Sequence, residues 1–178
     1  RGVNDVIIRG NRCDGVQIKA AGAALSSFRV SVLDNQIKDA QAYAVSVVVT
    51  EASAGQRQLK DVLIANNIAT GNGLRAPALY TGVDDGSGGT VLCRNVQISN
   101  NVVHMVWGTA EPNLVFIFHR GGSENLDVSI SITGNTCTDD GTAASAASSI
   151  TASGSGLYIA DNNINTNSLL YAISVVSN

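Results

Sequence analysis

Short segments of the chain alternate apolar and polar residues, as in Val-Ser-Val-Leu at 30–33 and Val-Gln-Ile-Ser at 96–99. A period of two predicts β-strands that turn one face towards a core. These segments belong to an eight-residue signature, apolar-x-apolar-x-x-Asn-x-(apolar or Cys). The signature occurs six times, with its asparagine at Asn11, Asn35, Asn67, Asn101, Asn135 and Asn162. Successive asparagines are therefore 24, 32, 34, 34 and 27 positions apart.

Internal repeats of about 20–50 residues are typical of solenoids, in which each repeat buries its apolar face against its neighbours. A second apolar run follows each asparagine, at 15–18, 43–47, 78–80, 114–118, 149–151 and 171–175. Helical periodicity is missing, which excludes helical repeats, and a β-sandwich would not be expected to repeat one Asn-centred turn in phase. We therefore expect an all-β chain, with residues 1–178 forming one single-stranded parallel β-helix of about six coils.

The asparagines are expected to stack as a ladder at one corner of the β-helix. Asn tolerates left-handed backbone angles, and stacked Asn side chains can hydrogen-bond along a column. Cys13 and Cys137 take the same inward position of the signature four coils apart, about 19 Å at roughly 4.7 Å per strand, too far for a disulfide. We expect these thiols to be small buried hydrophobes.

The six signatures resemble the rungs of right-handed parallel β-helices of the pectin-lyase-like superfamily, which includes polysaccharide lyases, polygalacturonases and bacteriophage tailspikes. The resemblance covers essentially the whole chain. Richness in Ala, Ser, Asn and Gly, uneven coil lengths and the lack of disulfides favour the tailspike branch. That branch implies a homotrimer that binds bacterial polysaccharide, on a virion or outside the cell. Separately, the strand pattern begins and ends abruptly, which leads us to expect a fragment of a longer chain or an assembly that caps the ends.

Charge and hydropathy exclude several other partners. The chain has a net charge of -3 and only three Lys, so no basic stripe is available to follow a nucleic acid. No run of 18 apolar residues is present, and we expect no insertion into a membrane. We predict no cofactor and no metal, since Asp84 and Asp85 alone form a weak cluster for an ion that takes 6 to 8 oxygens.

Long coils place their extra residues in two stacked sets of loops. The first loop column, at 70–77, 104–113 and 138–148, carries the candidates Arg75, His104, Trp107, Glu111, Asp139 and Asp140. The second loop column, at 82–90 and 119–125, carries the candidates Asp84, Asp85, His119, Arg120 and Glu124.

Glycoside hydrolysis in most families uses two carboxyl groups about 5 to 9.5 Å apart. Glu111 with Asp139 or Asp140 would be the catalytic pair. Trp107 would stack on a sugar ring, although packing over the core or in a trimer seam is an equal alternative. The remaining candidates would bind substrate: Arg75, His104, Asp84, Asp85, His119 and Arg120.

A 34-residue coil predicts that Asp85 and His119 are neighbours on adjacent rungs, where they would hold a sugar hydroxyl. An exposed ion pair without function is the alternative.

The enzyme motifs of the family are incomplete. Polygalacturonases carry Asn-Thr-Asp, Asp-Asp, Gly-His-Gly and Arg-Ile-Lys elements, and this chain has two Asp-Asp pairs but neither of the last two elements. Three hypotheses follow: a tailspike-like segment that binds, and in one version also cuts, a polysaccharide; a structural shaft that forms trimers; and a piece of a secreted lyase or hydrolase.

Overall fold

A computed structural model describes residues 3–20, 27–38, 43–50, 56–72, 78–84, 90–106, 115–121, 128–140, 148–154, 156–165 and 171–176. Within these ranges every regular element is a β-strand, and the strands form three parallel six-stranded sheets, A, B and C. Sheet A contains β1 (Val3–Arg9), β4 (Ser27–Leu33), β7 (Gln56–Ala65), β10 (Thr90–Ser99), β13 (Val128–Thr133) and β16 (Leu157–Ala160). Sheet B contains β2 (Arg12–Cys13), β5 (Gln36–Ile37), β8 (Ile68–Asn72), β11 (Val102–Val106), β14 (Thr136–Asp139) and β17 (Asn163–Asn165). Sheet C contains β3 (Val16–Ala20), β6 (Val45–Thr50), β9 (Leu79–Asp84), β12 (Ile117–Arg120), β15 (Ser148–Ser153) and β18 (Tyr171–Val176).

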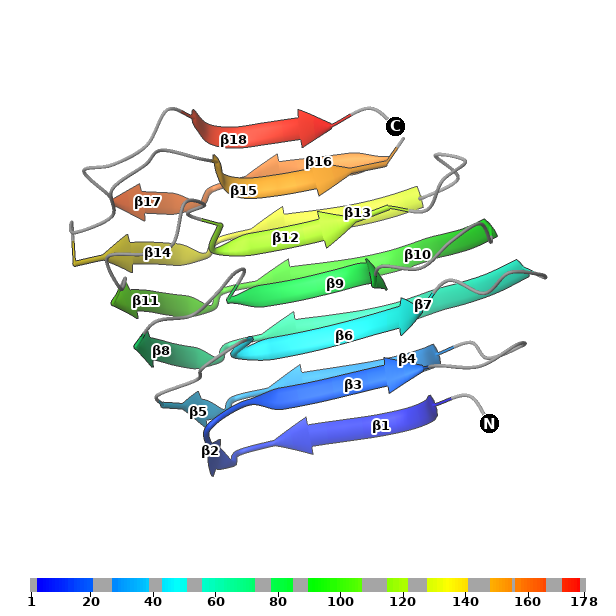
Figure 1. Cartoon of the computed structure of the whole chain (residues 1–178), viewed down its shortest axis with the longest axis horizontal. Helices are drawn as coiled ribbons and strands as arrows, with labels where there is room; N and C mark the ends of the chain where they lie inside the picture. The colour runs from blue at the N-terminus through cyan, green and yellow to red at the C-terminus, as the bar shows by residue number, and fades with distance from the viewer. Residues whose placement is uncertain are drawn as a thin grey trace.

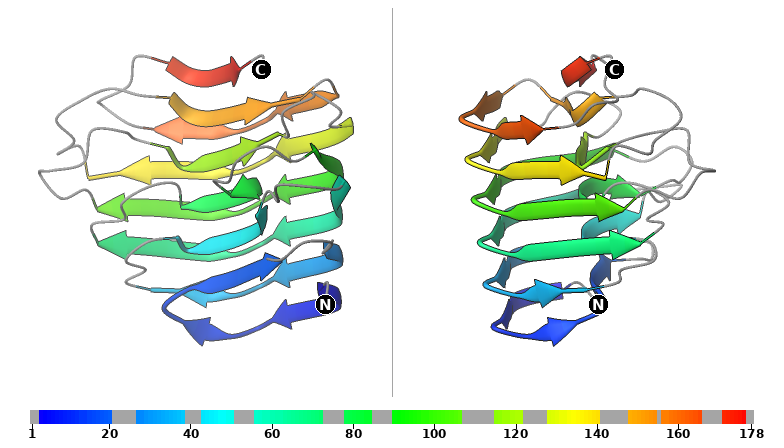
Figure 2. Two further views of the ribbon diagram at one scale, coloured as in Figure 1. Left: turned by 45° about the vertical axis from the view of Figure 1, so that its right-hand side comes forward. Right: turned by 90° about the vertical axis from the view of Figure 1, so that its left-hand side faces the viewer.

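The chain visits sheets A, B and C in that order six times (Figures 1 and 2). Each strand pairs in parallel with the strand three places later, so each set of three strands is one coil stacked on the last. This arrangement confirms the expected parallel β-helix of six coils, with three strands in each coil.

The core consists of inward columns of apolar side chains. In sheet A the first signature position forms the register Val30, Val62, Val96 and Ile130, all at most 1% exposed. Burial of each such side chain contributes about 1.5–3 kcal/mol. The alternation seen in the sequence therefore places one apolar side chain of every rung directly above that of the previous rung.

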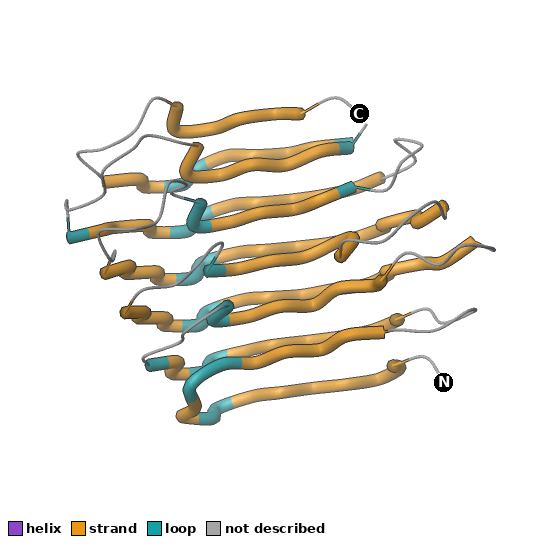
Figure 3. Tube along the Cα trace, viewed as in Figure 1, coloured by secondary structure: helices purple, strands orange, loops and turns teal. Residues whose placement is uncertain are grey.

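The asparagine ladder is confirmed along all six coils. The side-chain oxygen of Asn101 accepts from the backbone and side-chain nitrogens of Asn67, at 3.0 and 2.9 Å. Asn101 Nδ2 donates in turn to Asn135 Oδ1 at 2.9 Å. The same bonds join the other neighbouring pairs, and the turns that carry them stack at one corner (Figure 3).

Left-handed backbone angles occur one residue before the ladder, and the expectation that the ladder asparagines would adopt them is wrong. The residues with positive φ at this corner are Gly10, Asp34, Asn66, Asn100, Gly134 and Asp161. Gly, Asn and Asp are the residues that best tolerate this conformation. At this corner the residue with positive φ turns the chain, and the asparagine that follows it forms the hydrogen bonds between coils.

Sheet A has a second left-handed column that the sequence does not reveal. Asp5, Arg29, Asp61, Asn95 and Ser129 have φ between 52° and 60°, each within its strand. The register skips these residues, pairing Arg94 with Val128 and then Val96 with Ile130. These five strands are therefore bent at equivalent positions along their length.

Cys13, Ile37, Ala69, Val103 and Cys137 form one register column of sheet B, which confirms the shared inward position of the two thiols. None of the three cysteines forms a disulfide. Burial raises the pKa of the Cys137 thiol to about 12.

The strands extend further into the predicted loops than expected. In the first loop column β8 continues to Asn72, β11 to Val106 and β14 to Asp139. In the second, β9 continues to Asp84 and β12 to Arg120. Polar residues at outward strand positions, such as Thr70 and His104, made these segments resemble loops.

Candidate functional site

The described parts of the chain contain six of the eleven candidate residues. Asp139, Asp140 and His104 lie at the end of sheet B, whereas His119, Arg120 and the backbone of Asp84 belong to sheet C. The other candidates lie outside the described residues: Arg75, Asp85, Trp107, Glu111 and Glu124.

His104 belongs to a column of outward polar residues on sheet B, which we call the polar strip: Thr70, His104, Thr138 and Asn165. His104 Nδ1 lies 2.9 Å from Thr138 Oγ1. Both side chains are half-buried, and Asn165 is exposed. Because the strip follows the strand stacking, its members are spaced at about 4.7–4.9 Å along the axis of the β-helix.

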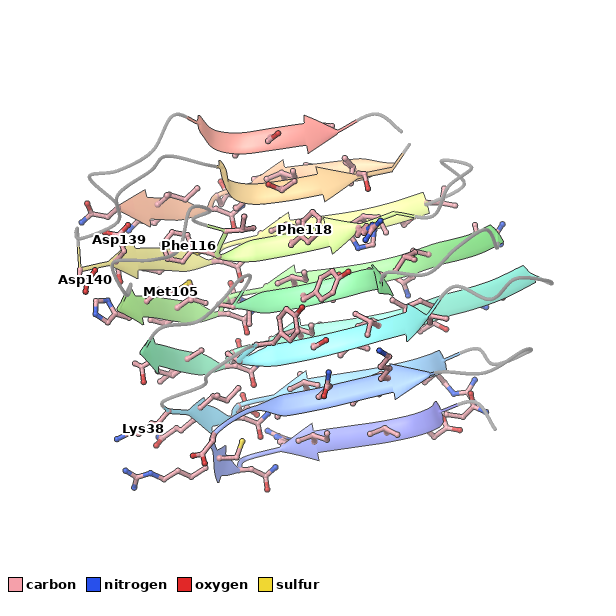
Figure 4. All side chains as sticks on the ribbon, viewed as in Figure 1. Lys38, Met105, Phe116, Phe118, Asp139 and Asp140 are labelled. Atoms are coloured by element: carbon pink, nitrogen blue, oxygen red, sulfur yellow. The ribbon has the colours of Figure 1, made fainter. Side chains whose placement is uncertain are left out.

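Asp139 and Asp140 lie beside the polar strip at the corner that leads to sheet C. Asp139 is half-buried and pairs in register with Met105, whose side chain is fully buried. Asp140 is exposed, and its backbone N–H donates to Met105 O at 3.2 Å. Figure 4 shows both carboxylates at the edge of the molecule, on the same side as Met105 and Phe116. The two acids thus differ in environment, with one against the core and one in solvent.

His119 does not lie on a loop surface, which corrects its assignment to the second loop column. The residue is fully buried in β12, and its Nδ1 lies 2.9 Å from Thr81 Oγ1. Strand β12 pairs with β9 at an offset of 38 residues, His119 with Thr81, so the expected 34-residue register with Asp85 is wrong. His119 therefore occupies the core between Thr81 and the buried Ala152.

Arg120 approaches the preceding coil very closely. It pairs with Gly82, which has φ of +106° and where an added Cβ would lie 2.0 Å from Arg120 O. The Arg120 side chain is half-buried on the outward side of sheet C. Only glycine fits at position 82, because a side chain would be strained at this backbone angle and its Cβ would overlap with Arg120 O.

An aromatic row on the outward side of sheet C was missed by the sequence analysis. Tyr80 and Phe118 are register partners and stack with ring centroids 5.4 Å apart at 12°. Tyr43 continues the row, 5.4 Å from Tyr80 at 30°. Tyr80 is only 5% exposed, and its hydroxyl donates to Val83 O. The signal was an aromatic residue in the second apolar run of three successive coils.

Among the described residues, no group of three or more His, Cys, Asp and Glu side chains is arranged to hold a metal ion. The same part of the chain contains no helix long and apolar enough to cross a membrane. Comparisons with protein-family models, with curated proteins and with solved structures give no match for this chain.

Proposed function

We propose that this β-helix binds a bacterial surface polysaccharide along the outer side of sheet B. In this proposal the chain is a tailspike-like segment of the pectin-lyase-like superfamily, right-handed and homotrimeric, on a virion or outside the cell. The observation that carries the proposal is the polar strip with Asp140 beside it. No other column of sheet B combines hydroxyl, imidazole and amide side chains on successive described rungs.

The strip suits an extended polymer of hydroxyl groups. Thr70 and Thr138 each offer one donor and two acceptor lone pairs, and the His104 ring offers a donor or an acceptor. These groups repeat along the β-helix axis, so one polymer chain can contact several of them at once. Once one sugar of the polymer is bound, the neighbouring sugars are held close to the next side chains of the strip, and several weak contacts together raise the overall affinity.

Cutting of the polymer is a separate part of the proposal, with Glu111, Asp139 and Asp140 as the acids. Asp140 is exposed and the neighbouring Asp139 is half-buried, so the two acids would meet a bound polymer in different surroundings. Release of reducing ends or of unsaturated uronates from a bound polysaccharide would demonstrate hydrolysis or lyase chemistry respectively.

A structural shaft is the second candidate, favoured by an apolar pair next to the strip. Ile68 and Val102 are register partners on the outer side of sheet B, and they are 50% and 44% exposed. Exposed apolar side chains in contact with one another are typical of surfaces that meet another subunit. In this alternative sheet B packs in a trimer and no ligand is bound.

A glycan array probed with the purified chain tests the proposal. We expect binding to bacterial polysaccharides that falls at least tenfold in H104A and D140N. Gln97→Ala is the matched control, because Gln97 is an exposed polar residue on sheet A. Absence of glycan binding, or equal binding by all variants, would overturn the proposal. Sedimentation equilibrium tests the trimer, and a monomer at all concentrations would exclude it.

A further inference from the structure

A groove of about 350 Å³ lies on the outer side of sheet A, whereas the polar strip belongs to sheet B. It is lined by Lys60, Arg94, Asn95, Val128 and Ser129. Strands β7 and β10, which contribute the two cations, are the longest strands described, with ten residues each (Figure 1). The volume is at the lower end of ligand pockets, near the size of a single small ligand.

The bend of sheet A creates this groove. Lys60, Arg94 and Val128 are register partners, and each precedes a left-handed residue, at Asp61, Asn95 and Ser129. The neighbouring Leu59 and Cys93 are fully buried, which turns Lys60 and Arg94 outward because strand side chains alternate. The two cations are therefore stacked on adjacent rungs next to the bend.

Such a pair of like charges is unfavourable without a counter-charge. Residues directly opposite on neighbouring strands have Cβ atoms about 4.5–5.5 Å apart, and like charges there are destabilising. Two coils below, the same bend carries opposite charges: Arg29 donates to both carboxylate oxygens of Asp5, one bond at 2.8 Å. Within the described residues neither Lys60 nor Arg94 forms an ion pair of this kind, and the carboxylate of Asp61 accepts from the neutral Asn95 Nδ2 at 2.8 Å.

We propose that this groove binds an acidic saccharide, with its carboxylate or phosphate group between Lys60 and Arg94. Arg94 supplies a fork of N–H donors that matches either anion, and Lys60 adds a point charge. The Ser129 hydroxyl is placed to bond a ring hydroxyl, and Val128, 42% exposed, packs against the apolar side of the ring. This inference deepens the proposed function, on which it rests for the class of ligand, and it adds a site separate from the polar strip.

An NMR titration of the isotope-labelled chain tests the site. Glucuronate, glucose 6-phosphate or glucose is added, and the shifts of the backbone amide signals are measured. We expect both anions, but not glucose, to shift the Asn95 and Ser129 amides, and higher salt to weaken the effect. K60Q and R94Q should each weaken binding at least fivefold. K38Q is the matched control, since Lys38 is an exposed lysine that directly follows β5 of sheet B.

The outcomes separate this inference from the function on which it rests. Shifts with glucuronate alone assign the site to carboxylates, and shifts with glucose 6-phosphate alone assign it to phosphates. Equal shifts with glucose, or equal affinity in K60Q and K38Q, would overturn the acidic site even if neutral polysaccharides bind at the polar strip. Specific shifts with the anions would uphold the groove even if the glycan array showed no binding by the polar strip.

Discussion

Asn101→Ala provides the most direct test of how the ladder stabilises the stack. The Asn101 side chain is fully buried and makes four hydrogen bonds, two accepted from Asn67 and two donated to Ile64 O and Asn135 Oδ1. After the substitution, Asn67 Nδ2 keeps its bonds to Val32 O and Ala65 O, and Asn135 Oδ1 keeps the Asn101 backbone donor. The Asn67 backbone N–H loses its acceptor, whereas Ile64 O lies within the pairing of β7 with β10 and loses only one donor.

Each buried polar group left without a partner costs about 1–3 kcal/mol. The unpaired Asn67 N–H therefore predicts a loss of about 1–3 kcal/mol in the free energy of unfolding. Asn11→Ala is the matched control at the end of the same ladder. Asn11 is exposed, and Asn35 Oδ1 keeps the backbone N–H of Asn11 as a donor, so we expect a loss below about 1 kcal/mol.

Urea unfolding followed by circular dichroism measures both values. Hydrogen exchange at the Asn67 amide should accelerate in Asn101→Ala, because that N–H loses its acceptor. Asn101→Asp keeps the volume and both acceptor bonds but places an oxygen opposite Ile64 O and Asn135 Oδ1, and it should destabilise the chain at least as much. Equal stability losses in Asn101→Ala and Asn11→Ala, or a neutral Asn101→Asp, would refute the hydrogen-bond explanation.

Three further predictions concern single positions. Gly82→Ala should lower the free energy of unfolding by about 2–6 kcal/mol, since it combines a strained φ with overlap against Arg120 O; Gly10→Ala, with φ of +68° and no atom within 4 Å, should lose only about 1–2 kcal/mol in the same thermal melts. Burial raises the pKa of Cys137 from 9.0 to about 12, so its contribution to the free energy of unfolding is complete below pH 9 and is lost as the pH rises towards 12, by up to about 1.4 kcal/mol per pH unit. In urea titrations at several pH values, Cys137→Ala should lose less stability between pH 9 and 12 than the unsubstituted chain. The same pH dependence in both chains would contradict this prediction. Arg29→Gln should raise the pKa of Asp5, which the side-chain hydrogen bond from Arg29 holds below its ordinary value, as measured by carboxyl carbon shifts; an unaltered titration would rule out that bond.

The fold was predictable because one residue type marks every coil. Asn is required at the ladder for its combination of donor and acceptor, so its six positions report the stacking directly. The bends of sheet A carry no such mark. Their residues include Arg29 and Ser129, which have no preference for left-handed angles, together with Asp and Asn. Stacking against neighbouring coils imposes the conformation there, and sequence reasoning therefore missed the groove beside Lys60 and Arg94.

The position of His119 shows why the candidate site was harder to predict than the fold. Between the third and fourth coils the offset is 34 residues in sheets A and B but 38 in sheet C, and it returns to 34 at the next strand pair of sheet A. The connection from sheet B to sheet C is therefore four residues longer in the fourth coil, and the connection from sheet C to sheet A is four residues shorter. Asparagine spacing gives only the sum of the two connections. The partition between them decides whether position 119 faces Thr81 in the core or an acid on the surface, and only the register of sheet C determines it.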